Sequence, residues 1–201
     1  MREKPDFYAQ KAQKEGYPAR SVYKLEEIQN KFRVFRPGNR VLDVGASPGS
    51  WSMYADRLLG GSGTIVAVDL NPLNMGGKPF RNALRFFRGD IFSEEIRAAI
   101  APFSPFSVIM SDAAPSTSGN SLVDARKSFD LVSRVITLSD DLLTDGGNMV
   151  VKIFQGGDER VLFEEMRKRF GRVKTFKPEA SRKISFETYF IGLGKGTASR
   201  E

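Results

Sequence analysis

The segment spanning residues 40–59 constrains the fold more than any other part of the chain. It begins with a short apolar run over residues 41–44 that is typical of a buried strand. The chain then turns through residues 45–49, which begin and end with glycine, and resumes as an amphipathic stretch over residues 51–59. A strand, a glycine turn and a helix in this order are typical of a nucleotide-type α/β site, because glycine lets the backbone approach a ligand closely.

The turn differs from the phosphate-binding loops. It contains neither G-x-G-x-x-G nor G-x-x-x-x-G-K-[S/T], and it supplies no lysine for phosphates. It reads D-x-G-x-x-P-G instead, with Asp43 inside the strand end, followed by Gly45, Pro48 and Gly49. A carboxylate suits a ligand with a positive or hydrogen-donating part better than one with phosphates. The loop therefore favours S-adenosylmethionine (SAM), and these four residues are candidate cofactor ligands.

Strand-like runs and helix-like stretches alternate from this segment to the end of the chain. The expected strands are residues 41–44, 64–69, 83–88, 107–112, 148–154, 172–176 and 185–193, and the expected helices are residues 21–32, 51–59, 93–100, 122–143 and 158–170. This alternation predicts a Rossmann-like α/β fold, a mostly parallel seven-stranded sheet with helices on both faces. We expect one domain, with an irregular basic arm over residues 1–19, a core over residues 20–193 and a flexible tail over residues 194–201.

The composition excludes several kinds of chemistry. The chain has no cysteine and no histidine, which excludes disulfides, thiolate and histidine metal sites and a Ser-His-Asp triad. Acid–base chemistry must then come from Lys, Asp, Glu or Tyr. No apolar run is long enough to cross a membrane and no export signal opens the chain, so we expect a soluble cytoplasmic protein.

The positive charge is concentrated towards the two ends of the chain. The formal net charge is +7, and residues 1–40 alone contain ten basic and five acidic residues. A second basic cluster lies within residues 172–183. Basic ends on a near-neutral middle predict a polyanionic partner, usually nucleic acid. The alternative is a charged surface that only confers solubility.

Acidic residues stand at the carboxyl ends of the expected strands, the edge at which open α/β sheets bind ligands. They are Asp43, Asp69, Asp90 and Asp112. Asp69 follows Gly45 at about the spacing that lets an acidic residue reach a ribose diol, and Asp90 is placed to accept from an adenine amino group. Each one alone could be a helix cap or a loop carboxylate. Together at one edge they favour a ligand site.

Lys152 is the most informative single residue, because it interrupts the apolar strand over residues 149–154. A charge there is costly to bury without partners. Glu187 likewise lies in an apolar strand, Asp112 ends the strand over residues 107–112, and Lys24 lies on the expected N-terminal helix. A neighbouring carboxylate keeps an amine protonated, whereas a second amine and partial burial lower a lysine pKa towards the range of a general base. The alternative is a lysine that extends into solvent from the strand end.

Five segments together resemble the FtsJ-type ribose 2′-O-methyltransferases, and within them the RrmJ-like enzymes of the large ribosomal subunit RNA. The segments are RSVYKLEEI (20–28), DVGASPGSW (43–51), MSDAAP (110–115), VVKIFQG (150–156) and SRKISFETY (181–189). They occur in the order of the family, and the resemblance extends over about residues 17–192. The glycine loop departs slightly, with Ala-Ser-Pro-Gly-Ser in place of the more usual Ala-Ala-Pro-Gly-Gly.

The resemblance implies roles for individual residues. It implies a catalytic tetrad of Lys24, Asp112, Lys152 and Glu187, in which Lys152 deprotonates or orients a ribose 2′-hydroxyl. It implies SAM contacts at Gly49, Trp51, Asp69, Asp90 and Asp112. Packing of Trp51 in the core is an equal alternative to direct ligand contact. No metal is required, because the donor already carries a positive charge.

The implied reaction is methyl transfer from SAM to a ribose 2′-hydroxyl. The expected substrate is a uridine of large-subunit rRNA, free or in the assembled subunit, and the expected enzyme is a monomer. One alternative is ribose methylation of a tRNA anticodon loop or an mRNA cap by the same tetrad. Another is a non-catalytic RNA-binding or ribosome-assembly protein on the same fold. A small-molecule methyltransferase fits the basic ends less well.

Overall fold

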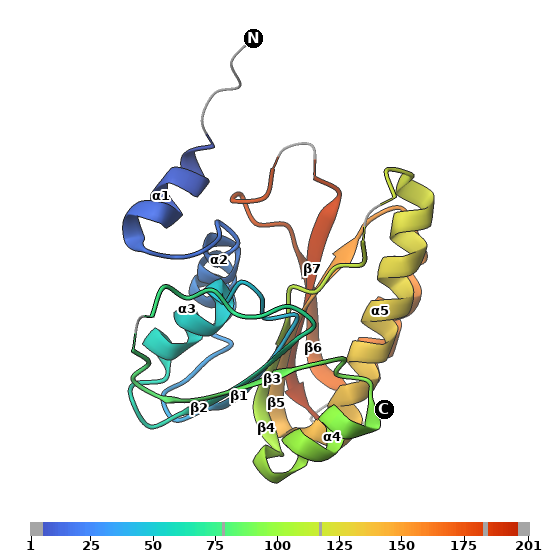
Figure 1. Cartoon of the computed structure of the whole chain (residues 1–201). Helices are drawn as coiled ribbons and strands as arrows, with labels where there is room; N and C mark the ends of the chain where they lie inside the picture. The colour runs from blue at the N-terminus through green and yellow to red at the C-terminus, as the bar shows by residue number, and fades with distance from the viewer. Residues whose placement is uncertain (1–5, 78, 117, 183–184, 197–201) are drawn as a thin grey trace.

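The structure is a computed structural model that describes residues 6–77, 79–116, 118–182 and 185–196. From α2 onward, the strands and helices follow one another in the predicted order (Figure 1). The elements are α1 (Phe7–Glu15), α2 (Val22–Phe32), β1 (Arg40–Val44), α3 (Ser50–Leu58), β2 (Thr64–Asp69), β3 (Ala83–Arg88), α4 (Glu94–Ile100), a 3₁₀ turn η1 (Ala101–Phe103), β4 (Phe106–Ser111), α5 (Ser121–Leu142), β5 (Leu143–Phe154), α6 (Glu159–Arg167), β6 (Phe170–Phe176) and β7 (Glu187–Lys195).

The strands form one seven-stranded sheet in the order β3-β2-β1-β4-β5-β7-β6. All neighbouring pairs from β3 to β5 are parallel, and β7 is antiparallel to both β5 and β6. The expected mostly parallel Rossmann-like sheet is confirmed. The strand order reverses between β1 and β4, which is the position where sheets of this kind bind their ligands.

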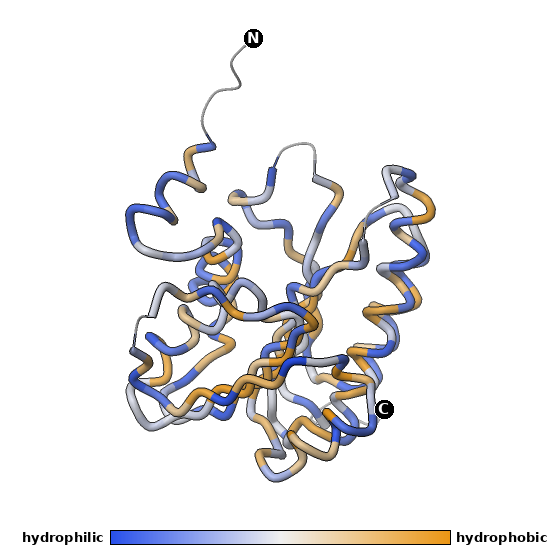
Figure 2. Tube along the Cα trace, in the orientation of Figure 1, coloured by the Kyte–Doolittle hydropathy of each residue, from blue (hydrophilic) through white to orange (hydrophobic). Residues whose placement is uncertain are grey.

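Two hydrophobic clusters hold the helices on opposite faces of the sheet. One contains Ile96 of α4, Val132 of α5 and Leu162 of α6, and the other contains Leu25 of α2 and Trp51 of α3. Because alternate side chains of a strand point to opposite faces, each central strand contributes to both clusters. Figure 1 shows α1, α2 and α3 to one side of the strands and α4 and α5 to the other. Figure 2 shows hydrophobic segments running along the strands between these layers.

The prediction of an irregular arm over residues 1–19 is wrong for Phe7–Glu15, which form α1. The Asp6 side chain caps this helix by accepting from the backbone N–H groups of Tyr8 and Ala9, at 3.1 and 3.3 Å. Gly16, with φ of 77°, ends it in a left-handed turn. The apolar face is too short to show as a period in the sequence, since Ala12 is the one fully buried residue of α1. Residues 1–5 lie outside the described part of the chain.

The expected tail over residues 194–201 begins too early. β7 continues to Lys195, whose Nζ donates to the carbonyl oxygen of Leu143 at 2.6 Å. Gly196 N donates to the carbonyl oxygen of Arg169 at 2.8 Å. The β5 strand also begins earlier than predicted, directly after α5. Residues 197–201 are outside the described residues, and within the described ones no helix is long and apolar enough to span a membrane.

Candidate active site

A cleft with a volume of about 480 Å³ opens at the carboxyl ends of β1, β2, β3 and β4. Its volume lies in the range of small-molecule and cofactor sites. The lining includes Gly45, Asp69, Asp90 and Asp112, each from a different strand end or the residues directly after it. Apolar side chains such as Ile91 complete the lining. The fold therefore brings four of the predicted ligand residues together around one cavity.

Gly45 is required where β1 meets the loop after β4. Its φ is 77°, a left-handed value that favours glycine, and a Cβ at this position would lie 2.6 Å from Cβ of Ala113. The Gly45 backbone N–H donates to the carbonyl oxygen of Val68 at 2.9 Å. The missing side chain thus lets the loop after β1 pass close to the loop after β4 and leaves the cleft between them open.

Asp69 and Asp90 bind backbone groups at the rim of the cleft. Asp69 accepts from the N–H groups of Ser47 and Asn71, at 2.9 and 2.7 Å, and so joins the glycine loop to the end of β2. Asp90 accepts from Phe92 N at 2.9 Å. Each carboxylate has further lone pairs available. Both are therefore fixed in place while retaining acceptor capacity towards the cavity.

The other predicted loop ligands do not line this cleft. Trp51 is 2% exposed, its Nε1 donates to the carbonyl oxygen of Ser21 at 2.9 Å, and its ring lies 5.8 Å from that of Tyr189. Gly49, with φ of 116°, packs where a Cβ would lie 2.6 Å from Met75, and the carbonyl oxygen of Pro48 accepts from Asn74 N at 2.9 Å. These residues therefore stabilise the conformation of the loop from outside the cleft.

Asp43 is fully buried beneath the glycine loop. Its Oδ2 accepts from the Ser52 hydroxyl at 2.6 Å, while Oδ1 has no hydrogen-bond partner among the described residues. Burial raises the pKa of Asp43 to about 7, the Ser52 hydrogen bond opposes this rise, and the charges of Asp112 and Asp69 add to it. The Asp43 side chain therefore supports the loop from within the core.

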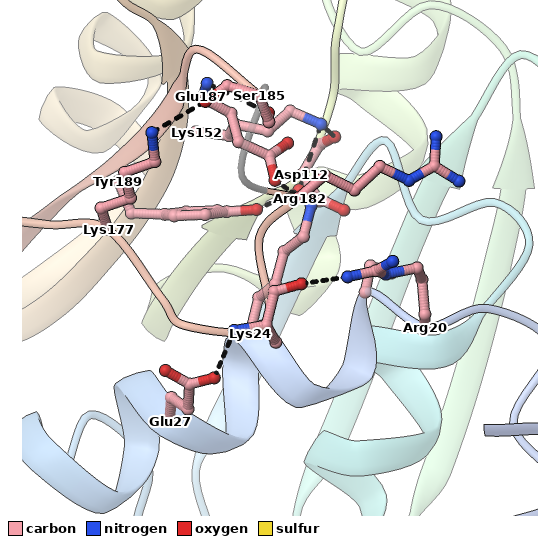
Figure 3. Close-up of polar contacts among 12 residues, drawn as sticks. Arg20, Lys24, Glu27, Asp112, Lys152, Lys177, Arg182, Ser185, Glu187 and Tyr189 are labelled. Atoms are coloured by element: carbon pink, nitrogen blue, oxygen red, sulfur yellow. Dashed lines mark hydrogen bonds and ion pairs between the residues drawn. The ribbon is translucent and has the colours of Figure 1, made fainter. Parts of the chain in front are cut away.

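The four residues of the expected tetrad form two ion pairs at one place on the sheet edge (Figure 3). Lys152 Nζ lies 3.1 Å from Oδ1 of Asp112 and donates to the Asp112 carbonyl oxygen at 2.6 Å. Lys24 Nζ pairs with Oε1 of Glu187. Lys24, Lys152 and Glu187 are each 8–9% exposed. Pairing offsets part of the free energy that burying these charges costs.

Strand register explains why these residues meet. Lys152 of β5 stands opposite Tyr189 of β7, and Phe154 stands opposite Glu187. Residues two apart on a strand share a face, so Lys152, Tyr189 and Glu187 all point to the face covered by α2, which carries Lys24. Asp112 follows the last residue of β4, the strand next to β5.

A family model described as FtsJ-like methyltransferase matches residues 17–195, nearly the whole chain. The chain belongs to the FtsJ-like methyltransferase family. Curated relatives agree with this assignment. A protein of Treponema denticola is 47% identical over 94% of this chain and 94% of its own length, and one of Borrelia garinii is 50% identical over 95% and 97%. Both are named ribosomal RNA large subunit methyltransferase E.

Solved structures share the FtsJ-like fold. A Plasmodium falciparum protein titled as a ribosomal RNA methyltransferase superposes with a TM-score of 0.72 at 24% identity, over 89% of this chain and 98% of its own. Aeropyrum pernix fibrillarin, solved with natively bound SAM, gives a TM-score of 0.62 at 16% identity, over 86% and 76%. At these identities the likeness concerns the fold alone.

Tyr189 is a residue of this FtsJ-like site to which the sequence pattern assigns no role. Its hydroxyl donates to Oδ1 of Asp112 at 2.8 Å, the same oxygen that pairs with Lys152. Burial, followed by the charges of Asp112 and Glu187, raises the pKa of Tyr189 well above its usual range, so the hydroxyl stays a donor. The sequence signal that could have identified Tyr189 is its position two residues after Glu187, which puts both side chains on the same face of one strand.

Proposed function

We propose that the protein transfers the methyl group of SAM to a ribose 2′-hydroxyl of large-subunit rRNA. The observation that carries this proposal is that Asp112 belongs both to the cleft and to the tetrad. It lines the cleft at the strand ends, and its carboxylate and carbonyl oxygens bind Lys152. A ligand in the cleft and a nucleophile beside Lys152 would therefore lie on either side of one residue.

The cleft residues suit the parts of SAM. The ligand would supply a methyl group on a positively charged sulfur, which the three carboxylates that line the cleft favour electrostatically. Asp69 would accept from the ribose hydroxyls and Asp90 from the adenine amino group. Asp112 would lie near the sulfonium, and Gly45 would let the ligand approach the backbone. Trp51, Gly49 and Pro48 would act through the shape of the loop.

Lys152 would handle the 2′-hydroxyl of the substrate. Two of its three amine directions are fixed by the carbonyl and carboxylate oxygens of Asp112, which leaves one for the ribose oxygen. In its neutral form the amine accepts the hydroxyl proton, and Asp112 stabilises the ammonium ion that forms. Tyr189 and the Lys24–Glu187 pair hold these groups in place. Alignment of nucleophile and methyl donor can account for several kcal/mol of the barrier.

Basic side chains around the tetrad would contact RNA phosphates. Figure 3 shows Arg20, Lys177 and Arg182 around the tetrad. Lys177 Nζ donates to the carbonyl oxygen of Ser185 at 2.8 Å, and Arg20 binds both Asp6 and the carbonyl oxygen of Ala180. These bonds fix α1 and the segment before β7 against each other. The basic rim favours RNA as the substrate, and the name of the relatives favours rRNA. We expect the enzyme to be a single-domain monomer that acts in the cytoplasm.

Tritium transfer from labelled SAM tests the proposal. We expect label in unmethylated large-subunit rRNA or in large subunits, recovered after alkaline hydrolysis as an alkali-resistant dinucleotide whose 5′ nucleoside is 2′-O-methyluridine. Alkali resistance is diagnostic because a methylated 2′-oxygen cannot attack the adjacent phosphate. Label in bulk tRNA only would contradict rRNA as the substrate but would still support methyl transfer to RNA. Binding of SAM without transfer to any RNA would instead indicate a non-catalytic RNA-binding protein.

A further inference from the structure

A basic hollow, separate from the cleft, lies at the opposite edge of the sheet from the tetrad. It has a volume of about 450 Å³, and its lining includes residues from the start of β4 and β6 and from the end of β7. Three arginines line it: Arg33 and Arg36 lie in the connection between α2 and β1, and Arg172 lies near the start of β6. The sequence places Arg172 in one cluster with Arg182, whereas the fold separates them to opposite edges.

The three guanidinium groups form no ion pair with any described residue. Asp145 is the one carboxylate that shares the lining with them, which leaves two net positive charges there. All three arginines are exposed. Arginine presents five N–H donors in a planar fork that matches the oxygens of a phosphate. Their donors are therefore accessible to an external anion.

The segment that carries two of these arginines is held rigidly. The Gln29 side chain accepts from Phe35 N at 2.9 Å and donates to the Phe35 carbonyl oxygen at 3.2 Å. Asn148 Nδ2 donates to the carbonyl oxygen of Val34 at 2.8 Å, and Arg36 N donates to Oδ1 of Asn39 at 2.8 Å. The backbone between α2 and β1 is thus fixed before any ligand arrives, which lowers the entropy that binding would cost.

Arg33 has a backbone conformation that is unfavourable for any residue with a side chain. Its φ is 54°, and among the residues the structure describes it is the one non-glycine with positive φ. It ends α2 with its N–H donating to the carbonyl oxygen of Gln29 at 2.9 Å, a position where helices most often carry glycine. Glycine would relieve the strain and leave the turn intact. An arginine held there at a conformational cost points to a role for its side chain.

We propose that this hollow is a second phosphate-binding site for the same RNA that enters the tetrad. The inference rests on the proposed function, because it needs an RNA substrate. Exposed Lys174 lies two residues after Arg172 on the same face of β6, and Lys177 follows at the tetrad edge. The distance from Arg172 to Lys177 along the strand is about 17 Å at roughly 3.3 Å per residue. RNA bound at the tetrad would therefore continue along β6 to the three arginines.

The test is the salt dependence of binding to unmethylated large-subunit rRNA. A variant with Arg33→Gln, Arg36→Gln and Arg172→Gln should bind about tenfold or more weakly, and its log–log salt slope should fall by about two to three units, because each lost phosphate contact removes about 0.7–0.9. A matched control, Arg85→Gln, Arg97→Gln and Arg167→Gln, changes the net charge equally outside the hollow and should keep the wild-type slope. Equal slopes for the two triple variants would overturn the proposal.

Arg33→Gly separates binding from folding. We expect it to lower RNA affinity without lowering the melting temperature, because glycine suits the left-handed turn; a lower melting temperature with unchanged affinity would make Arg33 structural and contradict the proposal. Weaker binding of the triple variant to intact subunits but not to protein-free rRNA would assign the hollow to an acidic protein surface instead. If wild-type protein binds rRNA but transfers no methyl group, the proposed reaction fails while the salt-slope comparison still tests the hollow.

Discussion

Lys152 Nζ lies 2.6 Å from the carbonyl oxygen of Asp112 and 3.1 Å from its carboxylate. The residue directly after β4 therefore holds the Lys152 amine through two separate oxygens. The same residue lines the cleft. In the proposed reaction, this arrangement would couple the position of the nucleophile to the position of the methyl donor. It also makes the consequences of changing either residue predictable.

Replacement of Lys152 with methionine should abolish methyl transfer while leaving SAM affinity within a few-fold of wild type. In the proposed mechanism the change removes the group that accepts the hydroxyl proton, and such a group contributes about 10²–10⁴-fold in rate. Lys152 does not line the cleft, so SAM binding should persist. Single-turnover rates and equilibrium binding of SAM measure the two effects separately. The exposed Lys168→Met serves as control. A parallel loss of SAM binding would mean that Lys152 is structural.

The buried pair Lys24–Glu187 should show strong coupling in a double-mutant cycle. Lys24→Met or Glu187→Gln alone should destabilise the fold by about 3–5 kcal/mol, because either one leaves a buried charge without its partner. The double variant should lose much less than the sum of the two. Urea unfolding measures all four corners of the cycle. Additive losses would contradict a direct interaction between the two side chains.

Tyr189→Phe should lower kcat by about tenfold with little change in KM for RNA or SAM. The variant keeps the buried ring against Trp51 but removes the donor to the Asp112 carboxylate, and a hydrogen bond to a charged group contributes about 1.5–3 kcal/mol. Steady-state kinetics with both substrates separates the two constants. A lower melting temperature with unchanged kcat would mean that Tyr189 contributes only to packing.

Asp43 should make stability fall as pH rises from about 4 to about 7. Its pKa is about 7 in the folded protein, against an ordinary value of 3.8, so the folded state holds a proton over this range that the unfolded state has released. Asp43→Asn removes this dependence. The free energy of unfolding of the variant, relative to wild type, should rise by about 4 kcal/mol between these pH values. Denaturant titrations at several pH values measure the difference, and a pH-independent difference would contradict the shift.

Gly45→Ala should impair both folding and SAM binding. The new Cβ would meet Ala113 at 2.6 Å in addition to the strain of a φ of 77°. Gly76→Ala is the matched control, because Gly76 also has positive φ, 61°, but a Cβ there would have no atom within 4 Å. The difference between the two variants in melting temperature and SAM affinity isolates the steric clash. Equal effects would show that backbone strain alone is responsible.

The sequence by itself determined the order of elements and most of the strand-end chemistry. Apolar runs, glycine turns and amphipathic periods are local signals, so the seven strands and the position of the cleft followed from them. Lys152 was recognisable because a charge inside an apolar strand needs partners wherever the strand lies. The resemblance to a known family then supplied those partners. The helix α1 was missed because its cap, Asp6, precedes a stretch with almost no apolar period.

Only the tertiary structure decided which distant side chains meet. The antiparallel register of β7 against β5 places Tyr189 beside Asp112 and Glu187 beside Lys24, and no local pattern specifies that register. The packing of α3 on the sheet directs Trp51 into the core rather than into the cleft. β6 runs across the sheet between Arg172, near its start, and the segment that carries Arg182, and its place in the sheet brings Arg172 into one hollow with Arg33. Spacing along the chain does not encode these distances, because they depend on how the strands pair.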